Sequence, residues 1–227
     1  MNFITLQTSD GFSMPALHVP STKGAGRPLV LIQEIFGINP AMKEAAQAWA
    51  AEGFDVVCPD LFARTRPGIE LDPTQQEEFK QGIDLMMAMD QDQAVRDLDA
   101  ARAWFIDQGK GPFVGALGYC LGGRLAVMMA LSTKISATVS YYGVGLEGLI
   151  PAEKVAAAPC LLHVAENDGF VPPPAREVIL KNAAAQAEMP AYVYAGCDHA
   201  FARPGGEHYV AAAADLARER TLAFLNR

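Results

Sequence analysis

One cysteine of this 227-residue chain stands in a sequence pattern that is typical of an enzymatic nucleophile. Cys120 lies in Gly118-Tyr119-Cys120-Leu121-Gly122-Gly123, between an apolar segment and a segment with helical periodicity. This is the cysteine form of the G-x-S-x-G turn, which exposes a strained residue between a strand and a helix. Glycine two positions away on either side avoids clashes. At the N-terminus of a helix, free amides and the helix dipole favour a thiolate over a thiol.

A nucleophilic cysteine needs a base and a carboxylate that orients the base. In enzymes with the G-x-S-x-G turn, the carboxylate follows the nucleophile along the chain, and the histidine follows the carboxylate. Asp168 and His199 each follow a predicted strand in that order. Because loops after parallel strands share one edge of the sheet, we expect both side chains near Cys120.

Other residues of the same types have alternative interpretations. Glu166 is a credible alternative to Asp168, whereas Asp198 adjoins His199 in sequence and is expected to have difficulty reaching its imidazole. Cys197 lies two residues before His199 and could approach the site, although a packing role is the favoured interpretation. The remaining histidines and cysteines are expected to be structural: His18, His163, His208, Cys58 and Cys160.

An acyl-transfer site also needs amide donors for the oxyanion. The amide of Leu121, directly after the nucleophile, is the first expected donor. The second should come from the loop after the first parallel strand, Gln33-Glu34-Ile35-Phe36-Gly37, where Ile35 is the natural candidate. An acid at Glu34, straight after an apolar strand, is unusual, and composition alone leaves open a surface carboxylate at a strand end.

The elements that must position these residues alternate between strands and helices after an opening hairpin. Period-two segments on both sides of Asp10-Gly11 predict the hairpin. Continuous apolar runs predict strands that are buried on both faces. The predicted strands are 3–8, 16–19, 29–32, 54–58, 113–117, 137–142, 160–165 and 191–194, and the predicted helices are 40–52, from about 73 to 89, 90–108, 121–131, 173–187 and 207–226. This order predicts a single α/β domain over residues 1–227, a mainly parallel twisted sheet with helices on both faces and an N-terminal antiparallel hairpin.

The composition limits the class of protein. With 51% hydrophobic and 19% charged residues, the chain has the composition of a folded protein rather than a disordered one. Its formal net charge is −8 and its Lys and Arg residues are scattered, so we expect no nucleic-acid partner. No apolar stretch approaches the ~18 residues of a membrane span. The first residues lack a signal-peptide pattern, which predicts a cytoplasmic protein without membrane contact. The four cysteines form no C-x-x-C pair, so no metal is expected.

Together these motifs resemble the dienelactone hydrolase family (carboxymethylenebutenolidases), small α/β-hydrolases with a cysteine nucleophile. The resemblance covers nearly the whole chain. Its anchors are Gln33-Glu34-Ile35-Phe36-Gly37, Val57-Cys58-Pro59-Asp60-Leu61-Phe62, Gly118-Tyr119-Cys120-Leu121-Gly122-Gly123, Asp168 with Phe170-Val171-Pro172, and His199 with Phe201-Ala202-Arg203.

The resemblance implies roles for individual residues. It implies a catalytic triad of Cys120, His199 and Asp168, and makes Glu34 an acid that takes the thiol proton when substrate binds. It implies that Arg203 holds a substrate carboxylate, a task that suits the guanidinium fork. The other substrate contacts that we expect are Phe36, Phe170 and Tyr142.

One segment departs from the family pattern. Members that act on dienelactone carry a second Arg and aromatic residues before the long helix, whereas 77–87 has no Arg, Tyr or Trp. A less cationic, more aliphatic pocket is therefore expected. The sequence predicts a hydrolase without cofactor, monomeric or a weak homodimer, that cleaves a small ester or dienelactone-type lactone through a thioester acyl-enzyme. The alternatives are a general carboxylesterase or thioesterase, and a catalytically silent small-molecule binding protein of the same fold.

Overall fold

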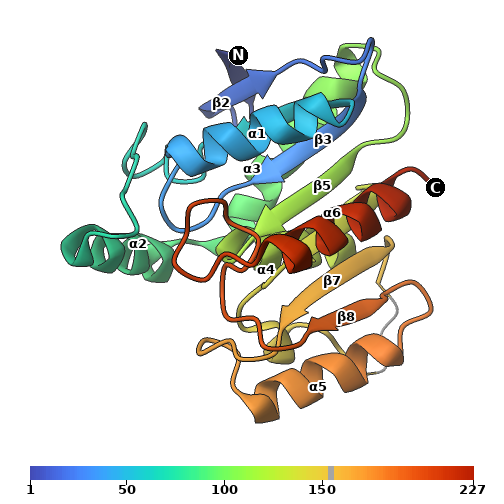
Figure 1. Ribbon diagram of the computed structural model, residues 1–227. Helices are drawn as coiled ribbons and strands as arrows, with labels where there is room; N and C mark the ends of the chain where they lie inside the picture. Colours follow the sequence, from blue (N-terminus) through green and yellow to red (C-terminus); the bar gives the residue numbers. More distant parts are fainter. Residues whose placement is uncertain (153–155) are drawn as a thin grey trace. The chain divides into compact units, whose positions relative to one another are not determined.

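The computed structural model describes residues 1–152 and 156–227 (Figure 1). The chain folds into two compact units, residues 1–116 and residues 117–227. Each unit is built on β-strands with helices packed against them. The division does not test the prediction of a single domain, which stays a prediction.

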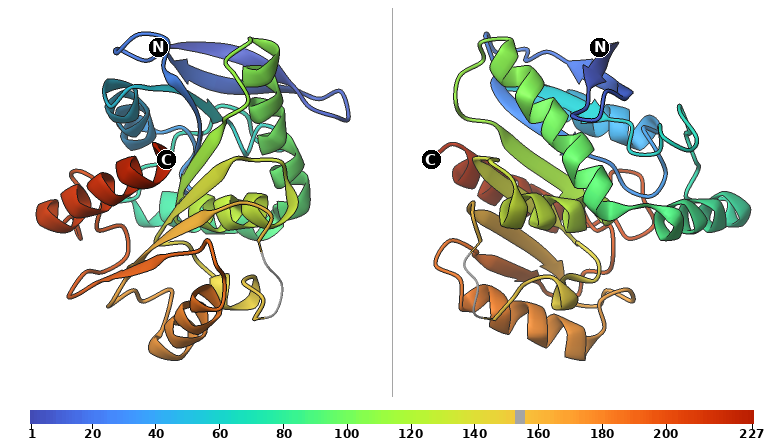
Figure 2. Two further views of the ribbon diagram at one scale, coloured as in Figure 1. Left: turned by 90° about the vertical axis from the view of Figure 1, so that its right-hand side faces the viewer. Right: turned by 180° about the vertical axis from the view of Figure 1, so that it is seen from behind.

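The first unit contains the predicted hairpin and the first parallel strand pair. Its strands are β1 (Asn2–Gln7), β2 (Ser13–Val19), β3 (Arg27–Ile32) and β4 (Phe54–Pro59), and its helices are α1 (Pro40–Ala51), α2 (Gln76–Ala88) and α3 (Gln91–Asp107). β2 pairs antiparallel with β1 and β4, whereas β3 runs parallel to β4. α1 and α3 lie on opposite faces of these strands (Figure 2). This arrangement explains why β4 is buried along its whole length.

Capping residues set the helix boundaries in this unit. The Asn39 side chain accepts a hydrogen bond from the Met42 amide, and Pro40 occupies the first helical turn of α1. Asp90 caps α3 in the same way through the Gln93 amide. α1 ends just before Gly53, whose φ of 106° is the left-handed conformation that glycine adopts without strain.

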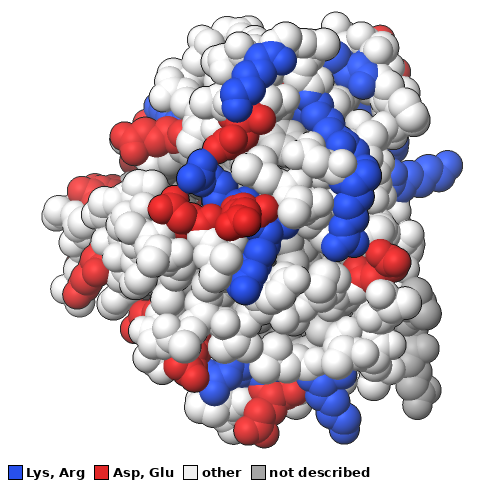
Figure 3. All heavy atoms as spheres, turned by 45° about the vertical axis from the view of Figure 1, so that its right-hand side comes forward, with Lys and Arg blue, Asp and Glu red and all other residues white. Residues whose placement is uncertain are grey.

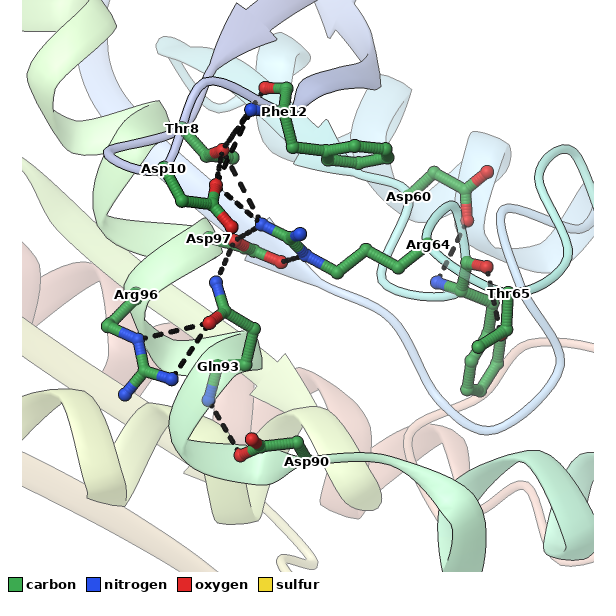
Figure 4. Close-up of polar contacts among 11 residues, drawn as sticks. Thr8, Asp10, Phe12, Asp60, Arg64, Thr65, Asp90, Gln93, Arg96 and Asp97 are labelled. Carbon is green, nitrogen blue, oxygen red and sulfur yellow. Dashed lines mark hydrogen bonds and ion pairs between the residues drawn. The ribbon is translucent and has the colours of Figure 1, made fainter.

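An ion-pair network around the buried Asp97 ties three separate segments of the first unit together (Figure 4). Arg64, in the loop after β4, donates to both carboxylate oxygens of Asp97 on α3, at 2.6 and 2.8 Å. It also donates to Asp10 in the hairpin turn at 2.9 Å, and its guanidinium lies over the Phe12 ring. Gln93 donates a further hydrogen bond to Asp97. The network therefore fixes the loop after β4 against α3 and the hairpin.

The second unit carries the remaining strands and helices. Strand β5 (Gly115–Tyr119) leads into it, followed by α4 (Leu121–Ser132), β6 (Ala137–Tyr141), the short 3₁₀ helix η1 (Leu146–Gly148), β7 (Cys160–Ala165), α5 (Pro173–Ala184), β8 (Ala191–Tyr194) and α6 (Ala211–Leu225). β6, β7 and β8 are neighbours and all run parallel. α6 packs on one face of these strands, and α4 and α5 lie on the other (Figure 2).

Most predicted elements are present, with shifted ends. The strand predicted at 113–117 is β5, which runs from 115 to 119, because the backbone stays extended through Gly118 and Tyr119 up to the turn. The last helix begins at Ala211 rather than at 207, since hydrogen-bonded turns occupy the preceding residues. His208 therefore lies before the helix and not at its start.

The surface carries charges of both signs. Figure 3 shows Lys and Arg side chains on the same face as Asp and Glu side chains. Within the described residues, no helix is long and apolar enough to cross a membrane.

Candidate active site

Cys120 occupies a strained turn between β5 and α4. Its φ of 55° and ψ of −114° lie outside the common regions for residues other than glycine. Its amide donates to the carbonyl of Tyr141 at 3.0 Å, which anchors the turn to the end of β6. A Cβ on Gly118 would lie 2.0 Å from the carbonyl oxygen of Gly122, and a Cβ on Gly123 would lie 2.8 Å from that of Tyr141. Both positions therefore require glycine.

His199 and Asp168 form a short, buried hydrogen bond. Nδ1 of His199 lies 2.8 Å from Oδ2 of Asp168, and the side chains are 13% and 1% exposed. Oδ1 of the same carboxylate accepts the Phe170 amide at 2.9 Å. The Cys120 thiol is also hydrogen-bonded to the His199 ring. Cys120, His199 and Asp168 thus form one continuous chain of hydrogen bonds.

This chain of hydrogen bonds makes the imidazole strongly basic. Burial by itself lowers the pKa of His199, because it disfavours the charged form. Hydrogen bonds to Asp168 and Cys120, with the charges of both groups, outweigh burial and raise the pKa of His199 to about 10. Such a ring holds a proton near neutral pH, which suits a residue that keeps the proton of a neighbouring nucleophile.

Two aromatic rings cover the imidazole. The Tyr142 and Phe170 rings approach that of His199 edge-on, with centroids at 5.1 and 4.8 Å. Tyr142 is buried, but Phe170 is 53% exposed. An exposed ring beside a base is a natural surface for an apolar part of a substrate.

Backbone strain is concentrated around these residues. In the described part of the chain, the residues other than glycine with positive φ are Cys120 (55°), Tyr142 (39°) and Ala200 (62°). Ala200 directly follows His199, and Tyr142 contacts its ring. Strained residues of this kind cluster at functional sites, where the surrounding structure holds them. This observation is independent of the side-chain chemistry and selects the same region.

The alternative carboxylates lie elsewhere. Oε2 of Glu166 accepts the Gly196 amide at 2.8 Å. Oδ1 of Asp198 accepts the backbone amide of His199 at 2.6 Å, and its other oxygen lies 4.0 Å from His208. The hydrogen bond to the His199 ring nitrogen comes from Asp168.

The other histidines have structural partners. Nε2 of His18 lies 2.7 Å from Asp55. Both ring nitrogens of His163 are hydrogen-bonded, to the hydroxyls of Tyr194 and Thr221, and burial lowers its pKa to about 3. A histidine that stays neutral and fully bonded cannot act as a base near neutral pH.

The other cysteines are buried free thiols. Burial raises the pKa of Cys160 to about 12 and also raises those of Cys58 and Cys197. They are poor nucleophiles for that reason.

The loop after β3 belongs to the first unit and is tightly held there. Glu34, Ile35 and Phe36 are all buried. The carbonyl of Phe36 accepts the Leu71 amide at 2.8 Å, and the Phe36 ring contacts that of Phe79 on α2. A Cβ on Gly37 would lie 1.8 Å from the carbonyl oxygen of Ile69. Glycine is therefore required where this loop turns.

Leu121, the predicted oxyanion donor, and Arg203, the predicted substrate contact, belong to the second unit. Leu121 is the first residue of α4, where backbone amides have no partner within the helix. Arg203 lies four residues after His199, in a turn where its amide donates to the carbonyl of Ala200 at 3.0 Å. Within the described residues, no group of three or more His, Cys, Asp or Glu side chains is arranged to hold a metal ion.

Comparisons with known proteins identify the family of the chain. A model of the dienelactone hydrolase family matches residues 14–227. The chain belongs to the dienelactone hydrolase family. It is 42% identical to a protein of Azospirillum brasilense assigned as a carboxymethylenebutenolidase, over 100% of this chain and 99% of that one. It is 39% identical to the carboxymethylenebutenolidase of Pseudomonas putida, over 98% and 94% of the two chains.

A solved structure shares the fold of this family member. A protein of Klebsiella pneumoniae subsp. pneumoniae, assigned as a dienelactone hydrolase, superposes with a TM-score of 0.83 at 24% identity, covering 100% of this chain and 98% of that one. The predicted α/β-hydrolase fold and the resemblance to the family are both confirmed. The prediction of an ester or lactone hydrolase is confirmed at the level of the enzyme class.

Proposed function

We propose that this dienelactone hydrolase family member cleaves a dienelactone-type lactone or a related small ester through a cysteine thiolate. The observation that carries the proposal is the hydrogen-bonded chain from Cys120 through His199 to Asp168. Its nucleophile sits in a left-handed turn that the flanking glycines make possible. The relatives named carboxymethylenebutenolidase support the lactone as the substrate class.

The proposed reaction has two steps. His199 accepts the thiol proton of Cys120, and the thiolate attacks the carbonyl carbon of the substrate. The amide of Leu121 donates to the oxyanion, and His199 returns the proton to the leaving oxygen as the thioester forms. His199 then takes a proton from water, which attacks the thioester and releases the acid and the free thiol. Asp168 keeps the accepting nitrogen of His199 directed at Cys120 throughout.

The proposal extends to the loop after β3 on the basis of the family resemblance. Ile35 would supply the second oxyanion amide. In the route that the resemblance implies, Glu34 would receive the thiol proton in place of His199 when substrate binds, and His199 would then serve as the base for water. The burial of both residues and the hydrogen bonds that hold this loop suit groups whose position matters. Arg203, Phe36, Phe170 and Tyr142 are the proposed substrate contacts.

Thiol replacement and labelling test the nucleophile. Cys120→Ala should lower kcat/KM for p-nitrophenyl acetate by at least about 10³, because a missing nucleophile removes the covalent step. Cys197→Ala is the matched control, since it removes a buried thiol of the same second unit and should leave turnover within about threefold. Iodoacetamide should modify Cys120 before the three thiols whose pKa burial raises. Retention of more than about a tenth of the activity in Cys120→Ala would show that the nucleophile is wrong.

The acyl-enzyme itself is open to observation. In His199→Gln, water lacks its base after the thioester has formed. Intact-mass spectra of this variant should show the acyl adduct, and a protease digest should place it on the peptide that contains Cys120. A lactone and a neutral ester measured side by side then separate a lactone hydrolase from a general esterase. A binding protein would turn over neither.

A further inference from the structure

A small cavity in the second unit is lined in part by Asp168. The volume that the centre of a water molecule can occupy in this cavity is ≈ 10 Å³, which is about what one buried water needs. Its polar lining residues include Ser140 and Asp168, and its apolar lining residues include Leu162, Val171 and Ile179. An apolar pocket of this size that contains buried polar groups can hold one ordered water.

The hydroxyl of Ser140 lacks a partner in the described structure. Ser140 lies on β6 and is 1% exposed, and its Oγ makes no hydrogen bond with any described residue. Two glycines make room for it, since a Cβ on Gly143 or Gly123 would lie 2.4 or 2.9 Å from this oxygen. Native proteins seldom leave a buried hydroxyl unsatisfied, and a buried water is a common partner.

Asp168 has the capacity for a further hydrogen bond. Its two oxygens accept the His199 ring and the Phe170 amide, whereas a carboxylate has about four acceptor sites. His163 also borders the cavity, but its side chain points to the other face of the sheet, where Tyr194 and Thr221 bond both ring nitrogens. Ser140 and Asp168 are therefore the side chains that a water in this cavity can join.

We propose that one ordered water in this cavity links the Ser140 hydroxyl to the Asp168 carboxylate, which makes Ser140 a positioning residue for the base. The water donates one hydrogen to the carboxylate and hydrogen-bonds to Oγ of Ser140. The water is inferred from the cavity and the unpartnered hydroxyl, whereas the positioning role of Ser140 rests on the proposed function of Asp168.

Such a water has a defined effect on His199. A hydrogen donated to Asp168 stabilises the carboxylate most when His199 is neutral, because the pair then carries a net negative charge. Losing that donor should therefore raise the pKa of His199. Among the described residues, Cys120, from the turn before α4, is the titratable group that acts on this pair. The His163 ring of β7 points to the other face of the sheet and stays neutral, because burial lowers its pKa to about 3.

Ser140→Ala separates this proposal from a hydroxyl that simply has no partner. If the water is present, the substitution should lower the melting temperature by about 2–4 °C, because the water loses a partner. NMR titration should also show the His199 pKa moving up. If the hydroxyl has no partner, its removal should raise the melting temperature and leave the His199 titration unchanged. That second result would overturn the proposal.

Thr138→Val is the matched control. Thr138 lies on the same face of β6, is equally buried, and is not among the residues that line the cavity. Its loss should leave the His199 titration unchanged, and an equal change in both variants would overturn the proposal. A crystal structure at about 1.5 Å should show the water peak between Ser140 and Asp168, and an empty cavity would also overturn it. These measurements need no turnover. A failure of the proposed function would appear instead as activity in Cys120→Ala, so the two failures can be told apart.

Discussion

Replacing Asp168 with asparagine would keep the shape of the side chain and remove its charge. The Phe170 amide donates to Oδ1, so the asparagine oxygen should take that place. The NH₂ group then faces Nδ1 of His199, where Oδ2 accepts in the native protein. A donor at this point favours the tautomer with its proton on the other ring nitrogen. That nitrogen faces Cys120 and could no longer accept the thiol proton.

The structure sets the size of the expected effect. The rise in the pKa of His199 from 6.5 to about 10 corresponds to about 5 kcal/mol between its protonation states, after burial has opposed it. The hydrogen bond to Asp168 is the largest single cause that raises it, followed by the hydrogen bond to Cys120. Asp168→Asn should therefore lower the pKa of His199 well below 10. The wrong tautomer should reduce kcat/KM by about 10³–10⁴.

The same substitution has a signed effect on stability. The folded-state pKa of His199 lies above its unfolded value, so protonation stabilises the native state. This contribution is fully present below pH 6.5 and is lost as the pH rises through about 10. The difference in unfolding free energy between the native protein and Asp168→Asn should therefore narrow from pH 7 to pH 10.

Three measurements check this reasoning: kcat/KM for p-nitrophenyl acetate, ¹⁵N NMR titration of the His199 ring, and urea unfolding at several pH values. Asp198→Asn and Glu166→Gln are matched controls, because both carboxylates accept backbone amides instead of the ring. Each should retain activity within about threefold. A loss of less than tenfold in Asp168→Asn, or a larger loss in Glu166→Gln, would refute the role of Asp168.

Further substitutions test separate parts of the structure. Arg64→Ala leaves the buried Asp97 carboxylate without its paired donors and should lower the free energy of unfolding by about 2–3 kcal/mol in urea titrations. Gly123→Ala places a Cβ 2.8 Å from the Tyr141 carbonyl and should cost about 1–3 kcal/mol and reduce kcat, measured by unfolding and turnover. Arg203→Ala should lower kcat/KM for anionic lactones roughly tenfold to a hundredfold and leave neutral esters unchanged, and equal losses would indicate a structural role.

The fold could be predicted because local signals and tertiary packing agree along most of the chain. The apolar run Cys160–Ala165 is a strand buried at every residue, and Asp90 caps α3 where the periodicity begins. The limits of β5 and the start of α6 were predicted less accurately. The glycine of the turn continues the strand, and the residues before α6 form turns through hydrogen bonds that composition does not specify.

The placement of Asp168 and His199 at one site followed from a rule of topology, that loops after parallel strands meet at one sheet edge. Position in the chain alone could not rank Asp168 above Glu166, because both lie in the same loop; the preference for Asp168 came from the family resemblance. Glu166 is occupied by the Gly196 amide, a contact across 30 residues. Only the folded backbone decides which of the two carboxylates reaches the ring.

The strained backbone around the site separates what local sequence encodes from what the fold imposes. At Cys120 the flanking glycines indicate the left-handed turn directly. At Tyr142 and Ala200 no neighbouring residue does, and each such conformation costs roughly 1–2 kcal/mol in an ordinary residue. At Tyr142 the compensation is tertiary, since its amide donates to the carbonyl of His163 at 2.8 Å. This hydrogen bond between strand ends offsets the cost at Tyr142 and holds its ring against that of His199. Any substitution that loosens the ends of β6 and β7 should release this strain and disorder the base before it unfolds the core.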